Sequence, residues 1–329
     1  MKRVLITGGA GFIGFHLAHE LLDHGYEVDL LDDFSRGVLD PDLEELSRRP
    51  SIRLFRRNLL ESGADSLGTD YRQIYHLAAI IGVAHVLRRP YAVLSDNLTL
   101  LLRALDIARQ QANLERFVFA STSEVYAGTL QHFGLPVPTP ETVPITIPDL
   151  VQPRTSYMLS KVYGEAICQH AGIPFTVVRP HNFYGGRMGL SHVIPELLKR
   201  AYESPPGSEL GVASMSHRRA FCYITDAVRT MRLLSESAAS ANQTLNVGNE
   251  DQEITIGELA QLIVSAIGKP LAITELPETP GSPSRRCPDI RRAVELTGFT
   301  PQVGLAEGIA LTYTWYKERV FEGTSASAL

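Results

Sequence analysis

The amino-acid sequence predicts an α/β fold in which a doubly wound parallel sheet is followed by a smaller, mixed region. Segments of strand length alternate with segments of helical periodicity as far as residue 180, which is the pattern of parallel βαβ units. A glycine-spaced turn stands between the first strand and the first helix, and shorter elements broken by glycine and proline follow Arg179. We therefore expect a sheet domain at residues 1–180, a partly interleaved region at 181–322 that closes over the sheet, and a frayed tail at 323–329.

The first strand and the turn after it have the form of a dinucleotide-binding fingerprint. The β-branched run Arg3–Thr7 is followed by Gly8, Gly11 and Gly14 at three-residue spacing, and then by a segment of helical periodicity. Glycine at these positions permits a tight turn, the approach of backbone N–H groups to a pyrophosphate, and close packing of the helix on the strand. We expect the pyrophosphate at the helix N-terminus, where unpaired N–H groups and the helix dipole favour an anion. The turn therefore predicts a Rossmann-like dinucleotide-binding domain.

The second strand supports the same interpretation. Residues 28–31 are predicted to form the next strand, which ends at Asp32, about twenty residues beyond the glycines, where a carboxylate binds the ribose hydroxyls of NAD. A carboxylate repels a 2′-phosphate, so the sequence favours NAD over NADP. Arg36 stands close enough along the chain to keep NADP as an alternative.

The remaining elements are expected in the following order. Further strands are predicted at residues 52–55, 73–77, 116–120 and 175–179. Helices are predicted at residues 91–111, 157–171, 194–202, 256–267 and 305–319. The segment 34–50 is predicted to be loop with a short helix, and 128–153 to be loop, because it contains five prolines between 136 and 148.

Composition and charge exclude several classes of function. The chain has 329 residues, of which 44% are hydrophobic and 20% charged, as in ordinary globular proteins. Its formal charge of −5 argues against nucleic-acid binding, and no apolar run is long enough to cross a membrane. The three cysteines lie far apart and the ten histidines lack metal-ligand spacing, so we expect no metal and no disulfide framework. The first strand begins next to Met1, which leaves no room for a signal peptide, so we expect a cytoplasmic protein.

Tyr157 and Lys161 form the candidate catalytic pair. They are four residues apart in a predicted helix and therefore share a face. An ammonium group beside a phenol, with a cationic nicotinamide nearby, favours phenolate and is expected to lower the pKa of the tyrosine. Tyr157 would then act as the base that removes a hydroxyl proton while hydride leaves the same carbon.

At this point the chain resembles the extended short-chain dehydrogenase/reductases, in particular the nucleotide-sugar epimerases, dehydratases and decarboxylases. The resemblance covers nearly the whole chain. It rests on motifs that occur in the family's order: Thr7–Gly14, Tyr75–Ala79, Asn97, Ser121–Tyr126, Tyr157 with Lys161, Arg179–Gly185, Arg219–Asp226 and Asn246–Asn249.

The resemblance implies NAD as a retained cofactor and a nucleoside-diphosphate sugar, with a UDP-sugar favoured, as substrate. It implies cofactor contacts from Gly8, Gly11, Phe12, Ile13, Gly14, Asp32, Asp33, Ser35, Asn58, Leu59, Leu77, Ala78, Ala79, Asn97, Tyr157 and Lys161. It implies catalytic roles for Thr122, Glu124, Tyr157 and Lys161, and substrate contacts from Ser123, Asn182, Arg219 and Arg286. Asn58 departs from the acidic residue that the family often has near the adenine. The family also implies a homodimer.

Glu124 bears on the reaction more than any other residue. Simple 4-epimerases of the family place a small residue here, whereas members that act at sugar C5 resemble this chain in having glutamate. The pair Ser123-Glu124 is similar to that of the hexuronate decarboxylases and the GDP-mannose dehydratases, and Arg154 and Arg286 also resemble the decarboxylases. The segment 128–153 and the stretch around Arg187 match no decarboxylase pattern. The resemblance therefore favours a UDP-glucuronate decarboxylase, with a 4-epimerase and then a 4,6-dehydratase as alternatives.

Overall fold

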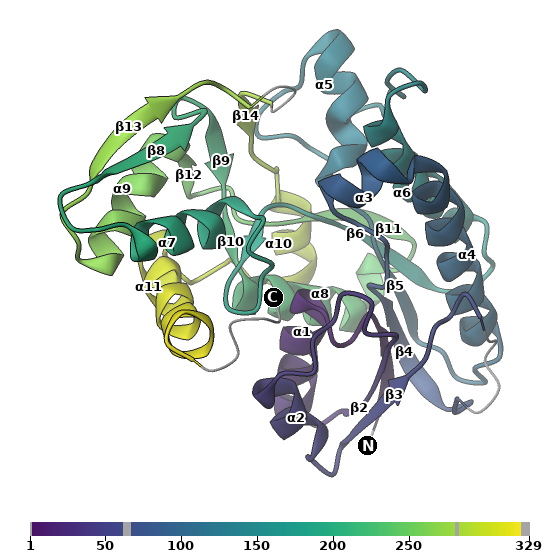
Figure 1. Cartoon of the computed structure of the whole chain (residues 1–329). Helices are drawn as coiled ribbons and strands as arrows, with labels where there is room; N and C mark the ends of the chain where they lie inside the picture. The colour runs from purple at the N-terminus through teal and green to yellow at the C-terminus, as the bar shows by residue number, and fades with distance from the viewer. Residues whose placement is uncertain (1, 62–66, 280–282, 324–329) are drawn as a thin grey trace.

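The sheet that organises the molecule has seven strands, all of them parallel. The computed structural model describes residues 2–61, 67–279 and 283–323. The order of the strands is β11-β6-β5-β4-β1-β2-β3, so β1 lies near the middle and the order reverses beside it (Figure 1). These strands are β1 (Arg3–Thr7), β2 (Glu27–Asp32), β3 (Ile52–Arg56), β4 (Tyr71–His76), β5 (Arg116–Ala120), β6 (Phe175–Pro180) and β11 (Gln243–Val247). The predicted fold class is confirmed, and ligands of such sheets bind at the carboxyl ends of the strands near this reversal.

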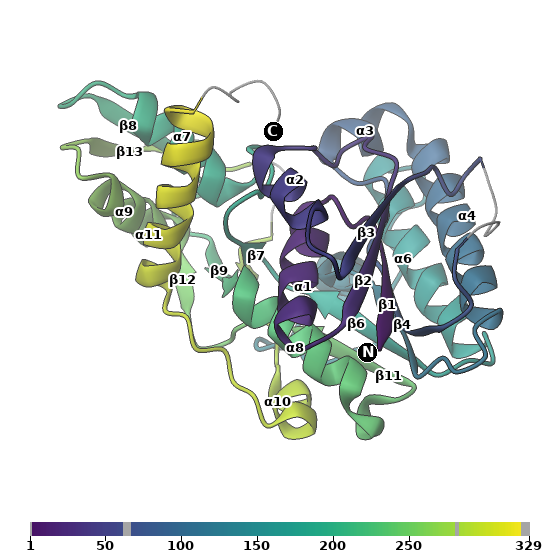
Figure 2. The same ribbon diagram turned by 90° about the horizontal axis from the view of Figure 1, so that it is seen from below.

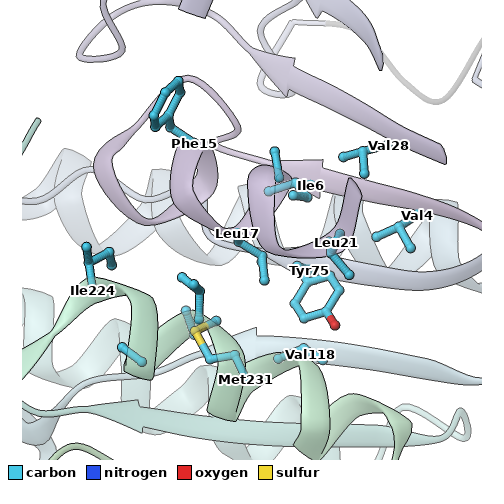
Figure 3. Packing of buried hydrophobic residues seen from close by; sticks show 14 of the residues in the cluster. Val4, Ile6, Phe15, Leu17, Leu21, Val28, Tyr75, Val118, Ile224 and Met231 are labelled. Atoms are coloured by element: carbon cyan, nitrogen blue, oxygen red, sulfur yellow. The ribbon is translucent and has the colours of Figure 1, made fainter. Parts of the chain in front are cut away.

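Helices cover both faces of the sheet because each face buries apolar side chains. On one face α1 (Phe12–Asp23) packs beside α8 (Ile224–Glu236), and on the other α4 (Pro90–Arg109) packs beside α6 (Pro153–Gln169). Figure 2 shows these two pairs on opposite sides of the strands. Between α1, α8 and the strands, Leu17, Leu21 and Met231 meet side chains of β1 and β4 (Figure 3). This packing fixes the N-terminus of α1 against the end of β1.

A smaller region built from later residues lies beside the carboxyl ends of the strands (Figure 1). Its core is shared by α7 (Val193–Glu203), α9 (Ile256–Ile267) and α11 (Leu305–Tyr316). Strand β8 (Glu209–Ala213) pairs with β13 (Ala272–Leu276), and β9 (Arg218–Ala220) lies between β12 (Glu253–Thr255) and β14 (Arg285–Arg286). The shorter elements are α2 (Pro41–Ser47), α3 (Val83–Arg88), β7 (Phe183–Tyr184), β10 (Cys222–Tyr223) and α10 (Arg291–Thr297).

Several boundaries differ from those that the sequence predicts. The segment 128–153 is not all loop, because α5 (Ala127–Phe133) occupies its start and Gly134 ends that helix with φ of 73°. Helix α6 begins at Pro153, four residues before the expected start, because proline is favoured at the first helical position. Helix α11 ends at Tyr316 and continues as a π-helical turn to Phe321. The expected tail lies, beyond Gly323, outside the described residues.

The chain returns to the main sheet after it has entered the smaller region. Helix α8 and strand β11, neither of which the sequence analysis predicted, both belong to the sheet layers, and β11 pairs in parallel with β6. Loops at the ends of β6 and β11 therefore connect the sheet with the smaller region. The division of the chain at residue 180 stays a prediction.

Candidate active site

The glycine turn after β1 leaves the N-terminus of α1 open. Gly8 has φ of 74°, and a Cβ there would lie 2.8 Å from the backbone nitrogen of Ala78. A Cβ on Gly14 would lie 2.4 Å from the carbonyl oxygen of Gly8, so only glycine allows the helix to start this close to the strand. Gly11 caps α1 without a side-chain hydrogen bond. The backbone N–H groups of the first turn, including Phe12 and Ile13, therefore remain available to an anion.

Asp32 stands at the end of β2 beside this turn. One carboxylate oxygen accepts from the backbone N–H of Ala10 at 3.0 Å and the other from that of Phe34 at 2.8 Å. Burial raises the pKa of Asp32, while the hydrogen bonds from Phe34 and Ala10 act in the opposite direction. A carboxylate has about four acceptor positions, so two remain for ribose hydroxyls. Asp33, next along the chain, accepts from the N–H of Ser35 at 2.9 Å.

The other predicted cofactor residues lie at the ends of β3 and β4. Leu77, Ala78 and Ala79 follow β4 and pass against Gly8, with the N–H of Leu77 donating to Thr7 O at 3.0 Å. Asn58 follows β3 and donates to Glu61 at 3.1 Å. Leu59 packs its side chain into the core.

Asn97 of α4 lies away from the glycine turn and holds the loop after β4. Its amide exchanges two hydrogen bonds with the backbone of Ile80, at 2.6 and 3.1 Å, and donates to Ser160 of α6 at 3.3 Å. Its expected contact with the cofactor stays a prediction.

These features fit NAD. The open helix N-terminus suits the pyrophosphate, the glycines provide room that a Cβ would fill, and Asp32 suits an unphosphorylated ribose.

The charge of Arg36 acts on Tyr157 and on His192. This places the guanidinium of Arg36 within electrostatic range of the catalytic pair.

Thr122 and Tyr157 come together at the end of β5. Thr122 caps the short 3-10 helix Ser123–Tyr126, and its hydroxyl accepts from the N–H of Glu124 at 3.2 Å. Burial raises the pKa of the Tyr157 phenol to about 12, and a hydrogen bond with Thr122 and the charge of Arg36 act in the opposite direction. A threonine hydroxyl and a tyrosine phenol next to each other can share the proton of a substrate hydroxyl.

Lys161 lies one turn further along α6 and is buried. Its ammonium donates to Ala120 O at 2.7 Å and lies 5.9 Å from the centroid of the Tyr157 ring. Burial lowers the pKa of Lys161 to about 8. Among the protein's own groups, Thr122 and Arg36 lower the pKa of Tyr157, whereas the charge of Glu124 raises it. The expected effect of Lys161 together with a bound nicotinamide on this pKa stays a prediction.

A second cluster of charge lies beside the catalytic pair. Arg286 of β14 pairs with Glu124 at 3.0 Å, and both side chains are partly exposed. Arg286 is the neighbour of Arg219 in the β14–β9 register. Burial and the charge of Arg286 together lower the pKa of Arg219 to about 10, with the charge of Glu124 acting in the opposite direction. Two adjacent guanidinium groups form a site suited to phosphate oxygens.

Asn182 and Ser123 complete the predicted set. Asn182 has φ of 43°, and its amide donates to Ala220 O at 2.8 Å, which ties the end of β6 to the strand that carries Arg219. Ser123, the first residue of the 3-10 helix, is buried. The structure thus brings Thr122, Glu124 and Tyr157 together at the carboxyl end of β5. Arg219 and Arg286 lie beside them, on strands β9 and β14 of the smaller region.

A buried ionic network beneath the site was missed by the sequence analysis. Arg179 of β6 forms a fork with Glu165 of α6 at 2.9 and 2.6 Å. Ser121 also donates to Glu165, at 2.5 Å, and Arg179 donates to the hydroxyl of Tyr126 at 2.7 Å. An arginine at the end of an apolar strand, and a glutamate four residues after Lys161, are the signals that could have indicated it.

The described residues contain no group of three or more His, Cys, Asp or Glu side chains that could hold a metal ion. Cys168, Cys222 and Cys287 are buried and free. Among the helices that the structure describes, none is long and apolar enough to cross a membrane.

Comparison with known proteins identifies a family and several relatives. Residues 4–248 match the NAD dependent epimerase/dehydratase family. UDP-glucuronic acid decarboxylase 1 from Danio rerio is 32% identical over 325 residues, covering 97% of this chain and 73% of that protein. UDP-N-acetyl-alpha-D-glucosaminuronate decarboxylase from Bacillus cytotoxicus is 31% identical over 332 residues, covering 96% of this chain and 98% of that protein.

Solved structures agree with the sequence match. UDP-glucuronic acid 4-epimerase from Bacillus cereus, solved with UDP-glucuronic acid and NAD, superposes with a TM-score of 0.81 at 25% identity, covering 96% of this chain and 99% of that chain. UDP-glucose 4-epimerase from Thermotoga maritima, solved with UDP-glucose, has a TM-score of 0.78 at 25% identity, covering 96% and 98%. The chain therefore belongs to the NAD-dependent epimerase/dehydratase family and is an NAD-dependent nucleotide-sugar-modifying enzyme.

Proposed function

We propose that this enzyme is a UDP-hexuronate decarboxylase, with UDP-glucuronate as its substrate. The observation that carries the proposal is the position of Glu124, whose carboxylate lies 3.0 Å from Arg286 and follows Thr122 by two residues. A carboxylate and an arginine this close to the catalytic pair supply groups that chemistry at C4 alone does not require. Decarboxylases of UDP-sugar acids among the relatives, at 31 and 32% identity, support the same assignment.

The first step is oxidation at C4. Bound NAD supplies reversible acceptance of hydride from this carbon. Tyr157 takes the proton of the C4 hydroxyl, and Thr122 holds the same oxygen through its own hydroxyl. Lys161, fixed on Ala120 O, keeps the helix face that carries Tyr157 against the end of β5.

The second step follows from the chemistry of the oxidised sugar. A ketone at C4 makes the C5 carboxylate of a hexuronate a β-keto acid. The bond between C5 and the carboxyl carbon breaks, CO₂ leaves, and the electron pair is taken up by the ketone as an enolate. Glu124 controls the proton that then returns to C5, and Arg286 orients the Glu124 carboxylate. The bound cofactor would supply the hydride that returns to C4, so the reaction would consume no cofactor.

We infer that the enzyme binds its substrate through a diphosphate, which fits the arginine pair of β9 and β14. Arg219 and Arg286 bind the phosphate oxygens and the ribose, and Asn182 holds the strand that presents Arg219. The related 4-epimerases from Thermotoga maritima and Bacillus cereus bind UDP-glucose and UDP-glucuronic acid in their solved structures. We therefore infer a UDP-sugar rather than another nucleotide sugar.

A 4-epimerase is the second candidate, followed by a 4,6-dehydratase. The epimerase reading is favoured by the likeness to UDP-glucuronic acid 4-epimerase from Bacillus cereus, which acts on a sugar of the same class. The deciding experiment is incubation of the purified enzyme with a panel of UDP-sugars, followed by mass spectrometry of the products. Loss of CO₂ from UDP-glucuronate is the expected result, whereas an unchanged mass identifies an epimerase and loss of water a dehydratase.

Replacement of Glu124 by Gln tests the step after oxidation. The amide keeps the size of the side chain but can neither take up nor deliver the proton at C5. We expect the variant to oxidise C4, seen as a rise in NADH absorbance in a single turnover, and then to stall. Glu295→Gln, which changes an exposed carboxylate on α10, serves as the control for effects of charge alone. A Glu124→Gln enzyme that completes turnover at the normal rate would refute a role for Glu124 at C5.

A further inference from the structure

Arg187 is buried although no catalytic step uses it. It follows Gly185 and Gly186 at the end of β7, in a left-handed conformation with φ of 66°, and 2% of its side chain is exposed. Burial lowers the pKa of Arg187, and the charge of Asp40 acts in the opposite direction. Burying a guanidinium costs free energy unless it is paired, so its partners indicate what it does.

The partners of Arg187 all belong to the cofactor side of the molecule. Nε lies 3.1 Å from a carboxylate oxygen of Asp40, and Nη2 donates to the carbonyl oxygens of Val38 at 3.0 Å and Ala10 at 3.4 Å. The guanidinium lies 4.1 Å from the centroid of the Phe15 ring in α1. The side chain is therefore enclosed by the glycine turn, the first turns of α1 and the loop 33–40.

The loop 33–40 carries residues that the NAD site requires. It begins directly after Asp32, and a Cβ on Gly37 would lie 2.9 Å from a carboxylate oxygen of Asp32 and 2.6 Å from the Cβ of Ala10. Ala10 itself donates to Asp32. Arg187 thus binds two segments that contact Asp32, the glycine turn at Ala10 and the loop 33–40 at Val38.

The same contacts attach the smaller region to this loop. The carbonyl oxygen of Gly186 lies 2.9 Å from Nε2 of His16 in α1. Asp42, in the first turn of α2, accepts from the indole N–H of Trp315 and from Arg319, each at 3.0 Å. Figure 2 shows α2 between α1 and the smaller region. Nε and Nη1 of Arg187 are both buried without a hydrogen-bond partner among the described residues, although Nε forms the ion pair with Asp40.

We propose that Arg187 is a positioning residue for NAD. It fixes the loop 33–40 against the glycine turn and against the smaller region. The residues around Asp32 therefore keep their positions between turnovers, and NAD stays bound. An enzyme that returns hydride to its own product needs the cofactor to remain bound, and a loop held by a buried ion pair supplies that retention. The proposal holds for a decarboxylase, an epimerase or a dehydratase alike.

Arg187→Met tests the proposal by cofactor affinity. Methionine retains apolar length but loses the ion pair and the hydrogen bonds, so we expect the Kd for NAD, measured by calorimetry on protein stripped of cofactor, to rise about tenfold. The amount of NAD that copurifies with the variant should fall accordingly. The control is Arg232→Met, since Arg232 is buried to the same degree and pairs with Glu20 and Glu236 on α1 and α8, away from the turn.

A milder variant guards against a failure to fold. Asp40→Asn removes the charge that faces Arg187 but retains a side-chain oxygen that can cap α2, as Asp40 does for the N–H of Leu43 at 2.9 Å. We expect it to weaken NAD binding severalfold, and the double variant with Arg187→Met to be little worse than Arg187→Met alone. An unchanged Kd for NAD in both variants, with loss of thermal stability equal to that of Arg232→Met, would show that Arg187 only supports the fold and would overturn the proposal.

Discussion

Burial acts in opposite directions on the two ionisable side chains of α6 that face the strand ends. It raises the pKa of Tyr157 to about 12 and lowers that of Lys161 to about 8. Both changes favour the neutral forms, so the protein alone holds the phenol protonated. A base at this position therefore depends on neighbouring positive charge, and Arg36 already lowers the pKa of the phenol. We therefore expect the phenol of Tyr157 to lose its proton only when positively charged groups lie next to it.

Tyr157→Phe should abolish turnover without loss of the cofactor. The hydroxyl is the group that takes the C4 proton, and removing a general base costs about 10² to 10⁴-fold in rate. The phenyl ring retains the packing of α6 at the end of β5. We expect kcat to fall by about a thousandfold while the Kd for NAD stays within about twofold, measured by product analysis and calorimetry. Turnover close to the normal rate would exclude Tyr157 as the base.

Lys161→Met should change how stability depends on pH. Folding lowers the pKa of Lys161 from 10.5 to about 8, so between these values the unfolded chain holds a proton that the folded protein does not. The contribution of Lys161 to stability therefore rises with pH across this window, and its burial cost is fully present below about pH 8. Urea denaturation at a series of pH values measures the free energy of unfolding. We expect its value for the wild type, relative to that of the variant, to rise by up to about 3 kcal/mol between pH 8 and 10.5. A difference in the free energy of unfolding between wild type and variant that stays constant across this pH range would contradict the assigned pKa.

At the scale of elements, the sequence predicted the boundaries of β1, β5 and α9 best. Residues 116–120 and 256–267 were predicted with the boundaries that β5 and α9 have, because β5 is a run of buried strand formers and α9 has a capping box between Thr255 and Glu258. Strand β11 was missed because Thr244 and Asn246 interrupt its apolar pattern. Its burial comes from pairing with β6, which the local sequence does not encode.

Contacts between distant segments limited the prediction of the site in the same way. The approach of Thr122, which follows β5, to Tyr157 of α6 was implied by the family resemblance, which assigns both side chains to the catalytic site. The pairs Glu124–Arg286 and Arg187–Asp40 join residues more than 140 positions apart. Each depends on how the smaller region sits against the sheet, so no periodicity or spacing in the sequence could indicate it.

Glu165→Gln tests how much the buried fork on Arg179 holds α6 to β6. The amide preserves volume but leaves a buried guanidinium without its charge partner, so we expect a loss of about 3 kcal/mol in the free energy of unfolding. Glu196→Gln is the matched control, because its pair with Arg200 on α7 is exposed and should cost less than about 1 kcal/mol. Urea denaturation measures both. Equally small losses in the free energy of unfolding of both variants would mean that the pair between Arg179 and Glu165 contributes little to stability.

At the scale of the whole molecule, the outer surfaces of α4 and α6 carry large apolar side chains that are exposed. Helices α4 and α6 lie side by side on the face of the sheet opposite α1 and α8 (Figure 1). Their outer surfaces carry exposed Tyr91 and Leu102 from α4 and Tyr163 from α6, with 83% of Tyr91 exposed. An exposed group of large apolar side chains on two adjacent helices is typical of a surface that another subunit covers. The catalytic pair is on α6, so contact at this surface would also stabilise the helix that carries Tyr157.

We predict that the enzyme is a homodimer in which α4 and α6 meet the same helices of a second copy around a two-fold axis. A two-fold interface is self-complementary, and two helices from each subunit can form a four-helix contact. Light scattering at micromolar concentration should give twice the mass of 36.2 kDa. Tyr163→Glu combined with Leu102→Glu should give a monomer because four carboxylates would be brought together at the axis, whereas Leu311→Glu, an exposed leucine on α11, should leave the dimer intact. A wild-type monomer, or a double variant that still dimerises, would show that α4 and α6 do not form the interface.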